Sequence, residues 1–200
     1  MNEIMAIWAE WLRPSAGLPT VPVHDMVIHP RERDLVIGSH GRGIWILDGI
    51  RGLEELTGAK ASSSSAIVAA RPGTQWTRFN RGRDAIGQTY FRASNPEDGA
   101  YLDYRIPAGA AATIEIFNAA GERVRTLPAP PPPSGASLAR IVWDMRGEPG
   151  AGQGPGRAGG AGGGGGGRGP LVPPGIYEAR LLAGGQTVTA RVEVRADPGR

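Results

Sequence analysis

Apolar residues follow two different patterns along the chain, and each pattern predicts a different environment. In the N-terminal quarter, Leu35–Ile37 and Ile44–Leu47 are continuous apolar runs with no polar alternation. Continuous short runs are typical of strands that are covered on both faces. On this basis we predict strands at Val23–His29, Leu35–Ser39 and Gly43–Asp48, followed by a short helix at Ile50–Leu56.

Residues 1–57 form a piece too small to cover both faces of its own strands. Strands that are buried on two sides need other elements packed against each side. We therefore expect this piece to need neighbours that the chain does not supply. The pattern over Met1–Leu12 fits either a short helix or a strand, and both alternatives stay open.

The C-terminal part of the chain shows strict apolar–polar alternation, which predicts strands with one buried face. In Val188–Val194 the apolar residues occupy every second position, and a Gly184-Gly185 pair precedes this run. A Gly-Gly pair between two alternating runs is a hairpin signal. The spacing of such runs predicts a β-sandwich over residues 76–196. The predicted strands are Tyr101–Ile106, Thr113–Phe117, Val124–Leu127, Ala139–Met145, Ile176–Leu182 and Val188–Val194.

Glycine and proline are concentrated in blocks that separate these patterned regions. The chain has 32 Gly and 18 Pro, many of them in Gly147–Pro170 and in a proline-rich stretch before Ser134. Because glycine loses the most backbone entropy on folding and this insertion has little to bury, we predict that residues 147–170 are disordered. Residues 58–75, which contain the run Ser62–Ser65, are predicted to be a linker in which Ile67-Val68 could add a short strand.

Charge and composition exclude several classes of function. The 22 Lys+Arg and 19 Asp+Glu residues give a net charge of +3. The small basic stretch at Arg78, Arg81 and Arg83 has only one interleaved aromatic residue, Phe79, so we predict no nucleic-acid partner. No apolar run reaches the roughly 18 residues of a membrane helix, and the first residues lack the features of a signal peptide. The compartment of this chain is left open.

The chain has no cysteine, which excludes disulfides and thiolate metal sites. The glycine run lacks the lysine of a phosphate-binding loop, and we predict no cofactor. His24-Asp25 together with His29 raises the question of a metal site. His24 and His29 are separated by an odd number of positions and should face opposite sides of one strand. The pattern therefore favours a structural or surface role, and no metal site is predicted.

His40-Gly41-Arg42-Gly43 lies between two predicted strands and is the best candidate for a binding site. One interpretation is a tight turn, in which two glycines permit positive φ and Arg42 caps carbonyl groups or pairs with a carboxylate. The other is a ligand-facing loop, in which Arg42 binds an anionic group. We favour the turn. The candidate binding residues are His40, Arg42, His24 and Asp25.

No residues are predicted to be catalytic. The carboxylates of Asp103, Glu115 and Asp144 are scattered along the sequence, and we cannot pair them as glycoside cleavage requires. Trp143 and Asp144 fit a core tryptophan followed by a residue that caps the end of a strand better than they fit chemistry.

The stretch GLPTVPVHDMVIHPRERDLVIGSHGRGIWILDGI resembles the closing blade of a large bacterial family of β-propeller proteins. These proteins carry BNR (Asp-box) repeats, are sortilin-like, and are often labelled glycosyl hydrolases. The Asp-box pattern S-x-D-x-G-x-T-W is absent from the chain, and with it the motif on which the hydrolase label usually rests. The resemblance covers residues 17–56 and is carried by Pro19, Val21–Asp25, Ile28–Pro30, Asp34-Leu35 and His40–Trp45.

Residues 90–195 resemble the immunoglobulin-like module of the flagellar hook-capping protein FlgD, which often follows such propellers. The landmarks are TIEIFNAAGERVRTL, IVWDMRGE and VPPGIYEARLLAGGQTVTARVEV. The two resemblances imply an all-β chain, with a partial terminal β-propeller blade at residues 1–57 and an immunoglobulin-like β-sandwich at residues 76–196.

The resemblance implies a function as well as a fold. By this resemblance, the chain is similar to a non-catalytic accessory or interaction module. Such a module would lie at the C-terminal end of a large exported propeller protein, which is periplasmic or extracellular. The alternative is the C-terminal part of a hydrolase whose catalytic residues lie on upstream blades. The implied partners are the upstream propeller blades of the parent chain and a carbohydrate or protein ligand.

Overall fold

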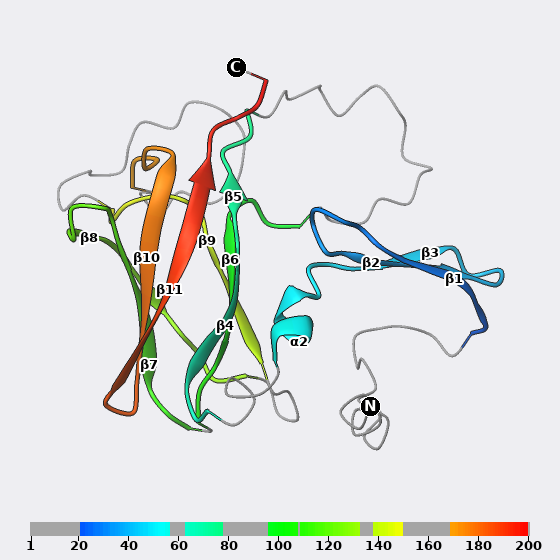
Figure 1. The fold of residues 1–200 in the computed structure, drawn as a ribbon, viewed down its shortest axis with the longest axis horizontal. Coiled ribbons are helices and arrows are strands. Elements are labelled where there is room, and N and C mark those ends of the chain that lie inside the picture. Colours follow the sequence, from blue (N-terminus) through cyan, green and yellow to red (C-terminus); the bar gives the residue numbers. More distant parts are fainter. Residues whose placement is uncertain are drawn as a thin grey trace, which may run out of the picture. The chain divides into compact units, whose positions relative to one another are not determined.

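The computed structural model describes residues 21–56, 63–77, 96–107, 109–132, 138–149 and 169–199. Within these ranges the protein is built from strands with one short helix, which confirms the predicted all-β fold class (Figure 1). The chain divides into two compact units between Ile50 and Arg51, and each is described by itself below. The predictions for Met1–Leu12, for Arg78–Arg83 and for residues 150–168 lie outside the described residues.

The N-terminal unit is one antiparallel sheet with the strand order β1-β2-β3. Its strands are β1 (Val23–Ile28), β2 (Leu35–Ser39) and β3 (Ile44–Leu47), as the apolar runs predict. In the central strand, Ile37 lies opposite Met26 and Trp45, whereas Val36 lies opposite Val27 and Ile46. Because directly opposed residues share one face of a sheet, both faces of this sheet carry apolar side chains.

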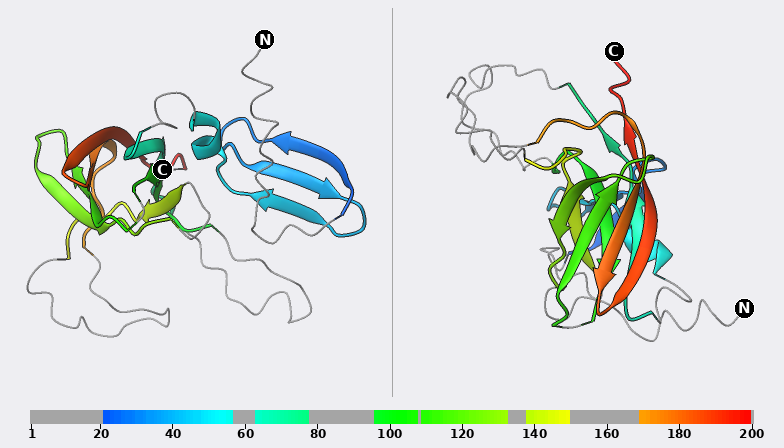
Figure 2. Two further views of the ribbon diagram at one scale, coloured as in Figure 1. Left: turned by 90° about the horizontal axis from the view of Figure 1, so that it is seen from below. Right: turned by 90° about the vertical axis from the view of Figure 1, so that its left-hand side faces the viewer.

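The C-terminal unit contains two sheets that share one core. One sheet has the order β5-β11-β10-β7-β8 and the other the order β4-β6-β9 (Figures 1 and 2). All neighbouring strands pair antiparallel except β5 and β11, which pair in parallel. Their bounds are β4 (Ala66–Arg71), β5 (Gly73–Thr74), β6 (Ala100–Arg105), β7 (Ala112–Phe117), β8 (Arg123–Pro128), β9 (Ala139–Trp143), β10 (Gly175–Ala183) and β11 (Gln186–Arg195).

The core of this unit lies between the two sheets. Trp143 of β9 is 0% exposed and packs edge-on against Tyr177 of β10, with ring centroids 5.1 Å apart. The Trp143 indole donates a hydrogen bond to the Arg146 carbonyl (2.9 Å), so its polar atom is satisfied. The predicted core role of Trp143 is confirmed. Burial raises the pKa of the Tyr177 hydroxyl, which donates to the Pro173 carbonyl.

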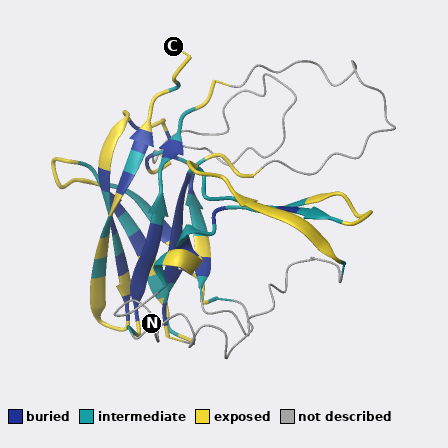
Figure 3. Ribbon diagram, turned by 45° about the vertical axis from the view of Figure 1, so that its right-hand side comes forward, coloured by how far each residue is buried: buried dark blue, intermediate teal, exposed yellow. Residues whose placement is uncertain are grey.

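The strand suggested at Ile67-Val68 in the predicted linker 58–75 is present, and strand structure extends beyond it over Ala66–Thr74. These residues form β4, which pairs with β6, and β5, which pairs with the end of β11. The first four residues of β4 are all buried, so the strand has no exposed face (Figure 3). A strand that is covered on both sides shows no alternation, and alanine adds little apolar signal. The sandwich therefore extends beyond the predicted boundary at residue 76.

The ends of the glycine-rich insertion are ordered, which corrects the predicted disorder at its margins. The Gly147 amide donates to the Pro170 carbonyl (2.9 Å), and Arg146 forms an isolated antiparallel bridge with Leu171. The Glu148 amide donates to the Val124 carbonyl (2.8 Å), which ties this margin to β8. Backbone pairing at the base thus fixes where the insertion leaves and re-enters the sandwich.

A short helix, α2 (Arg51–Glu55), belongs to the C-terminal unit and contacts β4. Its Gly52 faces Asp103 of β6, and a Cβ atom built on Gly52 would lie 2.6 Å from an Asp103 carboxylate oxygen. That carboxylate is held by Arg140 of β9 through two hydrogen bonds, Nε–Oδ1 at 2.6 Å and a second guanidinium nitrogen to Oδ2 at 3.1 Å. Asp103 is 7% exposed, so the ion pair is largely buried on its acidic side.

We predict that Gly52→Ala destabilises the C-terminal unit by about 1–3 kcal/mol, the range for overpacking at a buried site. In most helices a Gly→Ala substitution has the opposite effect on stability, because alanine stabilises a helix interior by about 1 kcal/mol relative to glycine. Urea denaturation of the full chain measures the change. Leu53→Ala, at a helix position that is 57% exposed, is the matched control and should shift stability little. A Gly52→Ala variant as stable as the parent would contradict this account of the helix contact.

Candidate functional site

The polar stretch between β2 and β3 is a tight turn held by its own hydrogen bonds. The Ser39 amide and hydroxyl both donate to the Gly43 carbonyl, at 3.2 and 2.7 Å. The Trp45 indole donates to the Arg42 carbonyl (3.0 Å). Gly41 and Gly43 have φ values of +73° and +76°, which glycine adopts without the penalty of a side chain. The positive φ values explain why glycine stands at positions 41 and 43.

His24 and His40 come together at this turn, a pairing that the sequence does not predict. The Nδ1 atom of His40 lies 2.9 Å from the Nε2 atom of His24, and the two ring planes differ by 15°. A bulge between Val23 and Asp25 shifts the register of β1 at His24, and the His40 amide donates to the Pro22 carbonyl (2.9 Å). One imidazole must donate and the other accept, so the contact suits a pair that carries at most one charge.

The other predicted candidates do not join this pair. Asp25 accepts a hydrogen bond from the adjacent Met26 amide (2.8 Å), and His29 accepts one from the Glu32 amide (3.1 Å) in the following turn. In the described ranges, no group of three or more His, Asp or Glu side chains could hold a metal ion.

Arg42 does not have the contacts that the turn interpretation gives it. Its side chain is exposed, and within the described part of the chain it neither caps a carbonyl nor pairs with a carboxylate. Within the described ranges, the turn thus presents the unpaired guanidinium of Arg42 and, on the same loop, the imidazole of His40, which is hydrogen-bonded to His24. Guanidinium and imidazole donors of this kind can bind an anionic group from solvent.

The scattered carboxylates of the C-terminal unit serve different purposes. Asp103 is bound by Arg140, and Glu115 accepts a 2.7 Å hydrogen bond from Arg123. One carboxylate oxygen of Asp144 is buried and has no hydrogen-bond partner among the described residues, so this oxygen does not cap the end of β9. Ion pairing therefore removes two of the three carboxylates from the candidates for chemistry and leaves Asp144.

No protein-family model matches the chain, and neither the curated proteins nor the solved structures contain a detectably similar chain. Across the described residues, no helix is both long enough and apolar enough to cross a membrane. The fold and the site geometry are thus the basis for any functional assignment.

We predict that Gly43→Ala weakens the β2–β3 hairpin by about 1 kcal/mol, because alanine is strained at a positive φ. Gly38→Ala is the matched control. Gly38 has no positive φ, and an added Cβ would make only an ordinary contact at 3.8 Å. Hydrogen exchange of the β2 and β3 amides measures both changes. Equal protection in the two variants would show that the turn conformation is not what fixes the hairpin.

Proposed function

We propose that this chain is a non-catalytic interaction module, the C-terminal end of a larger propeller protein. The observation that carries the proposal is the exposure of apolar side chains on the β1-β2-β3 sheet. Ile44 and Ile46 of β3 are 73% and 60% exposed, and Met26 and Val27 of β1 are 61% and 56% exposed. Figure 3 shows the strand β1 exposed along its length. Contiguous apolar exposure of this kind marks an interaction surface.

The register defines one apolar face of the sheet in detail. Val27, Val36 and Ile46 are directly opposed across the three strands, and Ile44 lies two residues from Ile46 on the same face. We name this set, Val27, Val36, Ile44 and Ile46, the apolar face. The natural cover for such a flat surface is a second sheet, which packs about 10 Å away with interdigitating side chains.

The occupant that we propose is another sheet of the same propeller, an upstream blade of the parent chain. The resemblance of residues 17–56 to a closing blade supports this choice, and so does the apolar character of both sheet faces. A carbohydrate does not fit the apolar face, because it offers no polar side chain to pair with hydroxyl groups.

We predict that the double variant Ile44→Lys/Ile46→Lys abolishes most self-association and most binding of an apolar dye to the full chain. Charged side chains at these positions make the face unfavourable for sheet-on-sheet packing. Sedimentation velocity and dye fluorescence are the measurements.

The matched control for this prediction is Ile176→Lys/Leu182→Lys in β10, two exposed apolar positions of the sandwich that are 55% and 36% exposed. The control variant should behave as the parent chain does. A monomeric parent chain that binds no dye, or an equal loss in both double variants, would show that the apolar face is not a docking surface.

The alternative is that the chain is the C-terminal part of a hydrolase whose catalytic residues lie on upstream blades. Activity of this chain alone would have to come from the His40–Gly43 turn. Hydrolysis needs an acid and a base or nucleophile held in register, and glycoside cleavage needs two carboxyl groups a fixed distance apart. The histidine pair of this turn contacts no carboxylate in the described residues.

We predict no turnover of aryl glycosides or model peptides by the purified chain, above the background of the buffer. Assays with His40→Ala and Arg42→Ala variants accompany the parent. Turnover that disappears in either variant would contradict the non-catalytic proposal and assign the chemistry to this turn.

A further inference from the structure

The N-terminal sheet brings together two of the chain's three histidines, and the proposed function uses neither of them. The Nδ1 atom of His40 lies 2.9 Å from the Nε2 atom of His24, although the two residues are 16 positions apart in the sequence. Both side chains are exposed, so a solute can reach them. The chain has no cysteine, and imidazole is a good ligand for late transition metals. The pair therefore has the chemistry of a metal site.

Backbone hydrogen bonds set the positions of both histidines before any ligand binds. The bulge in β1 lies at His24. The His40 amide donates to the Pro22 carbonyl (2.9 Å), and Ser39 next to it donates twice to the Gly43 carbonyl. A solute that binds both rings thus pays little for ordering the main chain, which favours binding.

The distance between the two nitrogens indicates which metals fit. A zinc–imidazole bond is about 2.0–2.1 Å long, and the bonds of copper and nickel are similar, so two such bonds meet at about 90° when their nitrogens are 2.9 Å apart. A tetrahedral ion would need nitrogens about 3.3 Å apart for the same bond length. An angle near 90° belongs to square-planar or octahedral coordination, which Cu(II) and Ni(II) adopt and structural Zn(II) does not.

A metal can replace the hydrogen between the two rings without any change in their charge. A neutral imidazole carries one hydrogen, which can sit on either of its nitrogens. The far nitrogens, Nδ1 of His24 and Nε2 of His40, have no hydrogen-bond partner in the described part of the chain. With both hydrogens on these far nitrogens, each near nitrogen offers a lone pair to the metal, and two neutral rings release no proton.

We propose that His24 and His40 form a two-histidine site for Cu(II) or Ni(II), which clamps β1 to the turn between β2 and β3. Within the described ranges no third side chain of the metal-binding types joins the pair, so water fills the remaining positions. The interpretation of the sequence that favoured no metal considered His24 with His29 and missed His40. Calcium and magnesium do not fit, because they prefer oxygen ligands.

The test is a calorimetric titration of the full chain with Cu(II), Ni(II) and Zn(II), each added alone. We expect one Ni(II) per chain, bound more tightly than Zn(II). This comparison tests the angle between the bonds, because Cu(II) binds most nitrogen sites more tightly than either. Hydrogen exchange measured by mass spectrometry gives a second readout. Openings that separate β1 from β2 should become about 100-fold rarer when free Ni(II) is about 100 times its Kd.

Two variants remove a ligand and keep a side chain that can still hydrogen-bond. His24→Gln and His40→Asn should each weaken Ni(II) binding at least about tenfold, because even a group that only orients a ligand contributes about 10- to 100-fold in affinity. The matched control is His29→Asn, which retains an acceptor for the Glu32 amide and should leave the affinity unchanged. Arg42→Ala should bind Ni(II) at least as tightly as the parent, because a guanidinium is not a ligand and its charge opposes a cation.

Four results would overturn the two-histidine site. They are no binding of Ni(II) by the parent chain, tighter binding of Zn(II) than of Ni(II), an affinity that survives both ligand variants, and a loss in the control variant as large as in the ligand variants. Copper bound equally by the parent and by both ligand variants would place that metal elsewhere on the chain and would count against the proposal.

Discussion

The C-terminal unit depends on a strand that is buried on both of its faces. In β6, Leu102 and Tyr104 are fully buried in the core, and Asp103 on the opposite face is 7% exposed. A carboxylate in that position needs a partner, because an unpaired buried charge costs several kcal/mol. Arg140 is this partner and donates two hydrogen bonds to the Asp103 carboxylate. The helix α2 covers this face and needs glycine at position 52, where it contacts the carboxylate. One ion pair therefore links three elements: the helix α2, the strand β6 and the strand β9.

The local pattern of apolar and polar residues predicts most of the strands, but it does not predict the side-chain contacts between them. The alternation in β10 and β11 and the Gly184-Gly185 turn predicted a hairpin that the structure contains. The linker predicted for residues 58–75 covers the strand β4. Burial on both faces removes the alternation of apolar and polar residues that identifies a strand. The contact of Asp103 with Arg140 joins residues 37 positions apart, and a single sequence gives no sign of such a pairing.

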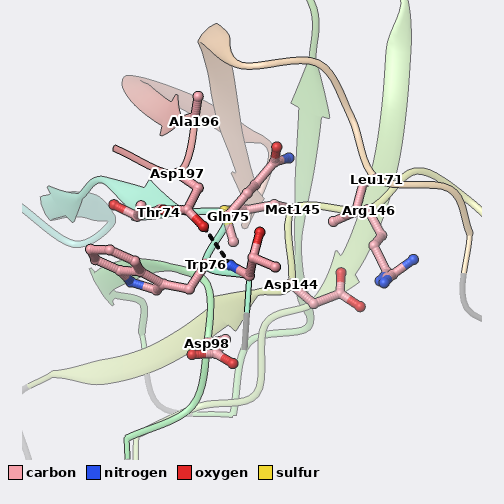
Figure 4. Close-up of a pocket in the computed structure, with 11 residues that line it drawn as sticks. Thr74, Gln75, Trp76, Asp98, Asp144, Met145, Arg146, Leu171, Ala196 and Asp197 are labelled. Carbon is pink, nitrogen blue, oxygen red and sulfur yellow. Dashed lines mark hydrogen bonds between the residues drawn. The ribbon is translucent and has the colours of Figure 1, made fainter. Parts of the chain in front are cut away.

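The candidate sites show the same division between local and long-range information. Glycine spacing predicted the turn at Gly41 and Gly43, because positive φ is a local property. The His24–His40 pair arises from a bulge in β1 that changes which residues meet across the hairpin, and strand periodicity alone places His24 elsewhere. The C-terminal unit also has a pocket lined by residues from five separate parts of the chain, among them Trp76, Asp98 and Asp144 (Figure 4), and such a set comes together only once the strands are placed.

The pairing at the base of the glycine-rich insertion has a consequence for how this fold can change over time. The bond from Gly147 to Pro170 closes the gap between β9 and β10, and the bond from Glu148 to Val124 ties this base to β8, both independently of the intervening sequence. Lengthening a loop whose ends are already fixed costs little, about 0.6 kcal/mol for each doubling. The site between these anchors is therefore a place where the gene can gain or lose codons, or accept an inserted domain, while the sandwich remains intact.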